Sequence, residues 1–321
     1  MTDFLKNSIF SSETRARAWL EARVWPRGPV CPHCGNTDEN KITHLEGEAH
    51  RPGLYQCNEP ECRLQFTVTV GTVLERSKIP LTKWLAALSL MTASKKGVSA
   101  HQIHRMLGVS YKSAWFMMHR LREAMRTGGL EPLGGAGKIV EADETYFGKR
   151  EEDYVSPYRR KPKSHAKSRN NRPIIALVER GGSVRSFHPG VADQYTVTEI
   201  VRENVARETM LHTDESKLYF NVKEHVAGHE TVKHTAKEYV RGTIHTNTIE
   251  NYFSVFKRGM RGVYQHCGEK HLHRYLAEFD FRYNNRAALG VNDADRADAL
   301  AKGIVGKRLT YRRPHEQDIP F

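Results

Sequence analysis

Two cysteine pairs near the N-terminus constrain the fold more than any other feature of the sequence. They are Cys31 with Cys34, in the segment CPHCG, and Cys57 with Cys62, in the segment CNEPEC. Two knuckles of this kind supply four thiolates, the ligand set of a closed tetrahedral zinc site that holds a fold and does no chemistry. Twenty-two residues separate the pairs, enough for a hairpin to bring them together. The pattern predicts a zinc ribbon; unpaired buried thiols and a redox pair are the alternatives.

The residues that follow the second pair predict a strand and then a helical region. The segment QFTVTVGTVL, residues 65–74, alternates between polar and apolar side chains as a half-buried strand does. Residues 76–130 have helical patterns, in which 99–107 and 111–125 flank the turn Gly108-Val109-Ser110. Ser110 is a good N-cap for the second of these helices. The pattern is typical of a helix-turn-helix unit.

In this unit the polar positions of the second helix are candidates for DNA contact. Lys112, Ser113 and the pair His119-Arg120 lie away from its apolar face. Recognition helices of such units present their polar side chains to the major groove. The alternative is a plain helical hairpin that packs onto the next domain.

The charge balance favours a polyanionic partner. The 321 residues include 50 Lys and Arg against 37 acids, a net charge of +13. Such an excess fits nucleic acid, because neutralised phosphates release counterions, although a basic but ordinary surface has the same composition. The segment 156–172 holds seven of the basic residues and no acid, and it is expected to form a loop or hairpin with non-specific phosphate contacts.

The sequence also favours an intracellular protein. No apolar run approaches the length of a membrane span, and the first residues lack the apolar stretch of a signal peptide. Paired cysteines in a cytosolic chain indicate metal binding rather than disulfides. We therefore expect a soluble, cytoplasmic, nucleoid-associated bacterial protein with no membrane partner.

The second half of the chain predicts a mixed sheet. Strand-like segments begin at KIVEADETYF, residues 138–147, and continue to about residue 245. Residues 173–180 and 183–189 read as a hairpin around Gly181-Gly182, and 196–205 as a helix. Residues 208–216 form a short apolar strand that ends at Thr213-Asp214. This order of elements suits an α/β fold with helices on the faces of the sheet.

Three acids of this half are candidate metal ligands. Asp143 lies in the first strand, Asp214 ends a later strand, and Glu250 lies at the start of a helix. Cleavage of a phosphodiester can use two Mg²⁺ or Mn²⁺ ions, which prefer oxygen ligands. Acids alone are a weak signal, because the chain has 37 of them. For Glu250, the alternative is a capping box with Asn247.

The helix that begins near Glu250 has a second polar residue on the same side. Lys257 lies two turns beyond Glu250, about 10 Å along the helix axis. A carboxylate for metal and a cation for phosphate would then face one DNA strand. The alternative for Lys257 is an ordinary solvated position.

Several segments together resemble insertion-sequence transposases of the ISXO type, a group related to the eukaryotic Merlin elements. They are CPHCG, CNEPEC, FTVTVGTVLERSKIPLTKW, VEADETYFGK, HTDES, HTNTIENYFSVFKRGMRGVYQH and HLHRYLAEFDFRYNNR, within residues 25–286. The resemblance implies a ribonuclease-H-like catalytic domain with Asp143, Asp214 and Glu250 as the metal-binding triad, followed by Lys257. Some members have Asn in the third position, so Asn247 and Asn251 remain alternatives.

The resemblance leads to a division of the chain and to a function. We expect a zinc ribbon with an N-terminal helix in 1–75, a helix-turn-helix module in 76–130, the catalytic domain in 134–290 and a tail in 291–321. The implied function is binding of the element's terminal inverted repeats, by a homodimer on paired ends, and metal-dependent cleavage and strand transfer into target DNA. A non-catalytic DNA-binding regulator and a ribonuclease-H-like nuclease are the rivals.

Overall fold

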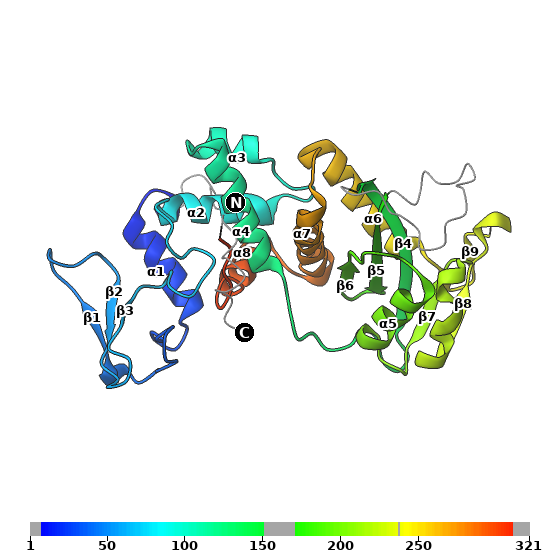
Figure 1. The fold of residues 1–321 in the computed structure, drawn as a ribbon, viewed down its shortest axis with the longest axis horizontal. Helices are drawn as coiled ribbons and strands as arrows, with labels where there is room; N and C mark the ends of the chain where they lie inside the picture. The colour runs from blue at the N-terminus through cyan, green and yellow to red at the C-terminus, as the bar shows by residue number, and fades with distance from the viewer. Residues whose placement is uncertain (1–7, 151–170, 237, 311–321) are drawn as a thin grey trace. The chain divides into compact units, whose positions relative to one another are not determined.

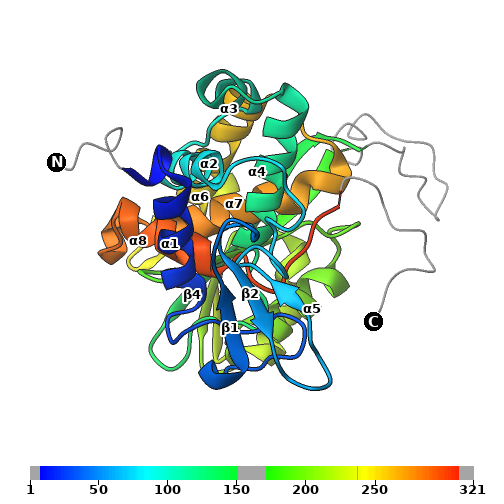
Figure 2. The same ribbon diagram turned by 90° about the vertical axis from the view of Figure 1, so that its left-hand side faces the viewer.

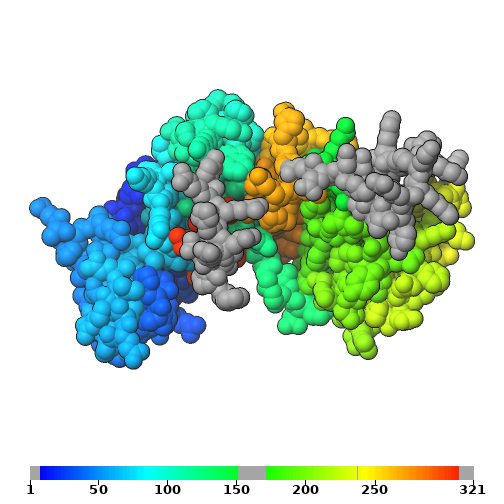
Figure 3. All heavy atoms as spheres, viewed as in Figure 1, coloured from blue at the N-terminus to red at the C-terminus, as the bar shows by residue number. Residues whose placement is uncertain are grey.

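The computed structural model describes residues 8–150, 171–236 and 238–310 (Figure 1; the other residues are grey in Figure 3). The chain forms two compact units, residues 1–127 with 292–321 and residues 128–291. Most of the basic segment 156–172 lies outside the described residues; only Asn171 and Arg172 belong to a described strand. Within the described ranges, no helix combines the length and apolar character that crossing a bilayer requires.

The first unit contains a small antiparallel sheet next to the cysteine pairs. Its strands are β1 (Ile42–Leu45), β2 (Leu54–Cys57) and β3 (Gln65–Phe66), in the order β1-β2-β3. Figure 2 shows β1 and β2 side by side. The buried residues Cys31, Ile42, Cys57 and Phe66 form a core, against which the partly buried Trp25 and Tyr55 pack. The ribbon is thus a small sheet with a core of a few aromatic and cysteine side chains.

The prediction of a strand over residues 65–74 is wrong beyond Phe66. The chain turns after this residue, and the Thr72 hydroxyl donates to the Thr69 carbonyl at 2.7 Å. Val68, Val73 and Leu74 are nevertheless buried. The alternating pattern therefore reports burial of side chains within turns, which periodicity alone does not distinguish from a strand.

Among the described helices of the first unit, the pair at residues 100–107 and 111–125 matches the sequence prediction. The α-helices of this unit are α1 (Glu13–Val24), α2 (Leu81–Ala93), α3 (Ala100–Leu107), α4 (Tyr111–Met125) and α8 (Asp293–Lys302). Ser99 and Ser110 cap α3 and α4, and Gly108 between them has a left-handed φ of 59°. The helix α8 packs against α1 and α2, with Arg23 Nε at 2.5 Å from Asp298 Oδ1.

Two polar residues of α4 are occupied within the unit. His119 is buried, with its ring 4.1 Å from that of Trp115, so the expectation that it reaches DNA is wrong. The Arg120 guanidinium donates to the backbone carbonyls of Glu75 and Leu309 at 3.0 and 3.2 Å. Lys112, at the start of the helix, is exposed.

The second unit is built on a five-stranded mixed sheet. Its strands are β4 (Ile139–Lys149), β5 (Asn171–Glu179), β6 (Val184–Phe187), β7 (Met210–Thr213) and β8 (Gly228–Thr231). They lie in the order β6-β5-β4-β7-β8; β5 is antiparallel to β4 and β6, and β7 and β8 run parallel to β4. Only β5, the second strand of this sheet along the chain, runs opposite to the other four. This is the ribonuclease-H-like topology, and the expected fold class is confirmed.

Helices cover both faces of this sheet (Figure 1). On one face lie α5 (Gln194–Asn204) and the 3₁₀ helix η5 (Lys217–His225). On the other lie α6 (Asn247–Gly259), its π-helical extension η7 (Met260–Tyr264) and α7 (Leu272–Asn284). The strand β5 alternates between the two cores: Ile174 and Ala176 pack towards α6 and α7, Ile175 and Leu177 towards α5.

Short elements connect these larger ones. The two-stranded hairpin of β9 (Val240–Arg241) and β10 (Ile244–His245) leads directly into α6. The remaining 3₁₀ helices are η2 (Ser8–Phe10), η3 (Glu39–Lys41), η6 (His234–Ala236), η8 (Glu269–His271) and η9 (Ala287–Leu289).

Candidate active site

The central strand β4 and its neighbour β7 bring two of the predicted acids together. Glu141 pairs with His212 in the parallel ladder, and two residues further along the same register Asp143 is level with Asp214. Because β7 ends at Thr213, β4 has no strand partner on its β7 side at the level of Asp143. Carboxylate oxygens of Asp143, Glu144 and Asp214 all lie within 4.8 Å of one another. The third member of this close group is thus Glu144, to which the sequence analysis gave no role.

The electrostatics of this group favour a bound cation. Burial, together with the nearby carboxylates of Glu144 and Asp214, raises the pKa of Asp143 to about 8. The pKa of Glu144 is also raised, by burial and by Asp214, although hydroxyl groups of Tyr219 and Ser216 oppose the shift. Among the residues that the structure describes, no lysine or arginine forms an ion pair with these three acids. Crowded carboxylates are the donor set of a hard divalent cation.

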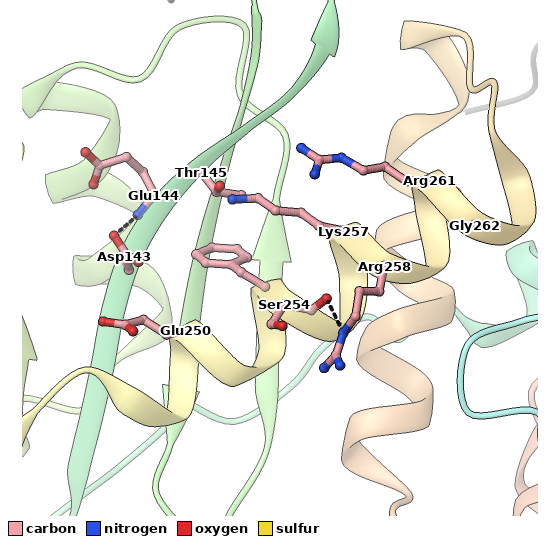
Figure 4. Close-up of a pocket in the computed structure, with 10 residues that line it drawn as sticks. Asp143, Glu144, Thr145, Glu250, Ser254, Lys257, Arg258, Arg261 and Gly262 are labelled. Carbon is pink, nitrogen blue, oxygen red and sulfur yellow. Dashed lines mark hydrogen bonds between the residues drawn. The ribbon is translucent and has the colours of Figure 1, made fainter.

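Glu250 lines the same site from the opposite side. It lies in the first turn of α6, half exposed, and Figure 4 shows its carboxylate extending towards Asp143. The Thr246 hydroxyl donates to its Oε1 at 3.0 Å, and His234 Nε2 lies 3.7 Å from the same oxygen. Glu250 does not belong to the close group of three carboxylates.

The structure reduces the alternatives that the sequence leaves open for Glu250 and for its neighbours Asn247 and Asn251. Thr246 is the N-cap of α6 and Asn247 its first residue, so the capping box of Asn247 with Glu250 does not form. Both Asn247 and Asn251 are exposed, and neither is among the described residues that line the pocket. Of the three side chains, only Glu250 faces the acidic group.

A pocket of about 740 Å³ separates this acidic group from a set of cations (Figure 4). Lys257 on α6 and Arg261 on η7 extend across it towards β4, whereas Arg258 points away from Asp143. The full lining is Asp143, Glu144, Thr145, Glu250, Phe253, Ser254, Lys257, Arg258, Arg261 and Gly262. Lys257 therefore lies where the sequence placed it, in one pocket with Glu250. Arg261 is one turn further along the same helical face, as the helical spacing predicts.

The four predicted zinc ligands also come together, in the first unit. The Sγ atoms of Cys31 and Cys62 lie 3.7 Å apart, as do those of Cys34 and Cys57, and all four lie within 4.8 Å of one another. A zinc ion with four sulfurs at about 2.3 Å has sulfur–sulfur edges of about 3.8 Å. Asn36 Nδ2 also donates to the Cys57 sulfur at 3.9 Å. The geometry fits a tetrahedral thiolate site.

Comparison with known proteins agrees with this architecture. The family model of the ISXO2-like transposase domain matches residues 132–284, and that of the transposase zinc-ribbon domain matches residues 11–65. A protein of the transposable element ISH50 from Halobacterium salinarum, itself described as uncharacterized, is 28% identical over an alignment of 284 residues. The alignment covers 85% of this chain and 91% of that protein.

Solved structures of the Mos1 transposase are distant neighbours. The Mos1 strand transfer complex is 14% identical and matches with a TM-score of 0.26, over 71% of this chain and 77% of that one. The mariner Mos1 paired end complex with Mg is also 14% identical, with a TM-score of 0.25, over 74% and 82% of the two chains. The fold assignment comes from the strand order of the second unit, not from these low scores.

The ribonuclease-H-like sheet with its clustered carboxylates and the thiolate ribbon that precedes it are consistent with one class of protein, the transposases. Both family models describe transposase domains, and together they span well over half of the chain. The chain belongs to the ISXO2-like insertion-sequence DDE transposases and carries a transposase zinc ribbon on the N-terminal side of the catalytic domain.

Proposed function

We propose that this transposase cuts and joins DNA strands at the pocket between β4 and α6, with Asp143, Asp214 and Glu250 as metal ligands. The observation that supports this most is the division of the pocket into a carboxylate side and a cationic side. Two ions, Mg²⁺ or Mn²⁺, would neutralise the phosphate charge and activate the attacking oxygen. Glu144, within the same close group, would serve as a further ligand or as a support for Asp214.

The cationic side of the pocket would hold the DNA strand. Lys257 provides a point charge for a phosphate oxygen, and Arg261 a planar fork that can bind two oxygens at once. Phe253 also lines the pocket, with the Lys257 Nζ 5.9 Å from the centre of its ring. The scissile phosphate would thus be bound between Lys257 and the carboxylates.

The first unit would recognise the ends of the element. Its helix α4 begins with the exposed residues Tyr111 and Lys112 after the left-handed turn at Gly108, as recognition helices do. The net charge of +13 supports contact with terminal inverted repeats and with target DNA. Strand transfer requires two ends, so we further propose a homodimer on paired ends.

In this proposal the ribbon holds one structural zinc ion through Cys31, Cys34, Cys57 and Cys62. The sulfur–sulfur distances of 3.7 Å support a closed tetrahedral site. Four thiolates leave no open position, so the zinc would stabilise the fold without taking part in the reaction.

The test is a cleavage and strand-transfer assay with labelled duplex of the element's own end, a target plasmid, and Mg²⁺ or Mn²⁺. We expect Glu250→Gln to lose strand cleavage by orders of magnitude, because it removes the charge that holds an ion. DNA binding and thermal stability should stay close to wild type. Lys257→Ala should weaken engagement of the DNA end and leave metal binding intact.

Asn247→Ala is the matched control, since Asn247 is exposed on the same turn of α6. It should cleave as the wild type does. Full activity in Glu250→Gln with loss in Asn247→Ala would move the third ligand to Asn247. Hydrolysis without any strand transfer would favour the nuclease, and metal-independent DNA binding with no cleavage would favour the regulator.

A further inference from the structure

An ion pair with a fully buried carboxylate lies outside the pocket and outside the group of candidate ligands. Glu141 on β4 has no exposed surface, and Arg180, which directly follows β5, donates from its Nε to Glu141 Oε1 at 2.6 Å. Neither residue lines the pocket. A buried pair of charges is weak support for stability on its own, because desolvation offsets much of the attraction. The role of the Glu141–Arg180 pair is therefore inferred from its contacts with other segments.

The Glu141 carboxylate caps the helix that carries Glu250. The backbone N–H groups of Thr248 and Ile249 donate to its Oε2 at 2.8 and 3.0 Å, and the Thr248 hydroxyl donates to its Oε1 at 2.8 Å. The first N–H groups of a helix have no partner within the helix, and negative charge is favoured there. The N-cap residue Thr246 makes no side-chain capping bond. The cap of α6 thus comes from β4.

Arg180 connects the same carboxylate to two further segments. Its guanidinium donates to the carbonyls of Thr243 and His245, at 2.6 and 2.8 Å, in the hairpin that leads into α6. Its Nη2 also lies 3.2 Å from Nδ1 of His212 on β7. One ion pair therefore contacts β4, β7 and the start of α6, the elements that carry the three acids or immediately precede them.

The spacing along each element is the same. Asp143 follows Glu141 by two residues, Asp214 follows His212 by two, and Glu250 follows Thr248 by two. On β4 this spacing puts Glu141 and Asp143 on one face, because side chains of a strand alternate. We propose that the Glu141–Arg180 pair is a positioning device that fixes Asp143, Asp214 and Glu250 relative to one another. This inference rests on the proposed function, and both residues act through the acids.

A second buried pair in the same unit provides a matched control. Glu278 of α7 has no exposed surface, forms an ion pair with Arg282 and accepts from the Tyr264 hydroxyl at 2.5 Å. Within the described part of the chain, its hydrogen bonds and ion pairs do not involve the first turn of α6. Glu141→Gln and Glu278→Gln therefore each remove one buried charge from an Arg pair, and only the first takes one of the two acceptor oxygens from the cap of α6.

The first test is hydrogen–deuterium exchange on the full-length protein, without DNA or added divalent metal. Glu141→Gln should accelerate exchange in the peptide that covers residues 244–252, and Glu278→Gln should not. The double variant Glu141→Gln/Arg180→Gln leaves no unpaired buried charge and should show the same local acceleration if the single variant folds poorly. Unchanged exchange in this peptide in the double variant overturns the proposal, whatever the protein catalyses.

The second test is a double-mutant cycle on the rate of Mg²⁺-dependent cleavage of the labelled element end. Glu141→Gln should raise the Mg²⁺ concentration for half-maximal rate and lower the rate at saturating Mg²⁺ by about a hundredfold, the cost of a misplacement near 1 Å. In the Glu250→Gln background the same change should cost much less, because the acid that it positions is already gone.

The outcomes separate the two ideas. Equal losses from Glu141→Gln with and without Glu250 mean that Glu141 acts independently of this acid, and the positioning role is then wrong. Glu278→Gln should be less stable but cleave at the wild-type rate; an equal loss there would reduce Glu141 to a stability residue. If the wild type does not cleave at all, the proposed function fails, and the exchange experiment alone decides on the cap.

Discussion

At the scale of single residues, one partly buried aspartate joins three elements of the catalytic domain. Asp280 of α7 accepts hydrogen bonds from the N–H and hydroxyl of Ser186 on β6, at 2.9 and 2.7 Å, and from the Tyr252 hydroxyl on α6, at 2.5 Å. Burial raises the pKa of its carboxyl to about 6, although these three donors oppose the shift. The raised pKa of Asp280 means that desolvation of its carboxylate outweighs these hydrogen bonds.

This raised pKa predicts a pH dependence of stability. The folded protein holds the Asp280 proton up to about pH 6, whereas the unfolded chain releases it near the usual value of 3.8. The free energy of unfolding should therefore fall as the pH rises from about 4 to about 6 and remain lower above that range. The size is on the order of 3 kcal/mol, at about 1.4 kcal/mol per pKa unit.

Thermal melting of the wild type and of Asp280→Asn across this range isolates the effect of this carboxyl. Asn cannot titrate, so the difference in midpoint between the two proteins should change from pH 4 to pH 6.5 and then stay constant. Parallel curves over the whole range would mean that the Asp280 pKa is close to that of the unfolded chain.

At the scale of elements, the local signals of the sequence were sufficient where a helix is capped by its own neighbours. The side chains of Ser99 and Ser110 accept from N–H groups three residues away, so the bounds of α3 and α4 followed directly from the sequence. The cap of α6 comes from Glu141, more than a hundred residues earlier. No local sequence pattern predicts a contact between residues so far apart in the chain. The expected capping box of Asn247 with Glu250 is therefore wrong, and a long-range contact caps α6 instead.

The residues of the candidate site also divide into those that local sequence patterns predict and those that depend on contacts between distant segments. Asp143, Asp214, Glu250 and Lys257 came from motifs and helical spacing, and the structure gathers them around one pocket or beside it. Glu144 was missed because its closeness to Asp214 depends on where β7 ends, which is a property of strand pairing. Adjacent side chains of a strand point to opposite faces, so strand alternation does not predict that Glu144 joins Asp143 in one group.

The ribbon is the element for which removal of a ligand is most informative. Its core contains little besides Cys31, Ile42, Cys57 and Phe66, with Trp25 packed edge-on against Phe66 at 5.8 Å. So small a core depends on the metal for its folding free energy. We expect about one zinc per chain in the wild type, almost none in Cys57→Ser, and fast hydrogen exchange over residues 31–66 in this variant.

The matched control is Cys267→Ser, which changes the one cysteine outside the ribbon. Its thiol donates to the carbonyl of Gly268 at 3.3 Å in the second unit. Zinc content and exchange over residues 31–66 should equal those of the wild type. Wild-type protein purified without chelators that contains no zinc by elemental analysis would overturn the assignment of the four cysteines.

At the scale of the whole molecule, the excess of basic residues and the clustered acids have opposite consequences for DNA. The chain carries +13 overall, yet three of its acids crowd around the point where we propose that the phosphate is cut. Affinity for any duplex should therefore come from cations distributed over the protein, while the catalytic acids repel DNA until divalent ions are bound. Binding and chemistry would then be separable by salt and by metal.

This separation predicts how affinity depends on salt. In buffer without added Mg²⁺, the affinity for a shuffled duplex should fall by about 10³-fold or more between about 50 mM and 200 mM salt, as expected for several phosphate contacts. The affinity for the element's end should fall in parallel, with the ratio between the two duplexes preserved, because base contacts carry that preference. Above the Asp143 pKa of about 8, where this carboxyl is ionised without bound metal, Asp143→Asn should bind both duplexes more tightly than the wild type at low salt, since it removes a negative charge from the pocket, while it cleaves neither. Titrations of both duplexes by anisotropy at several salt concentrations measure all three quantities. A salt-insensitive affinity, or weaker binding by Asp143→Asn, would show that DNA does not approach the acidic group as proposed.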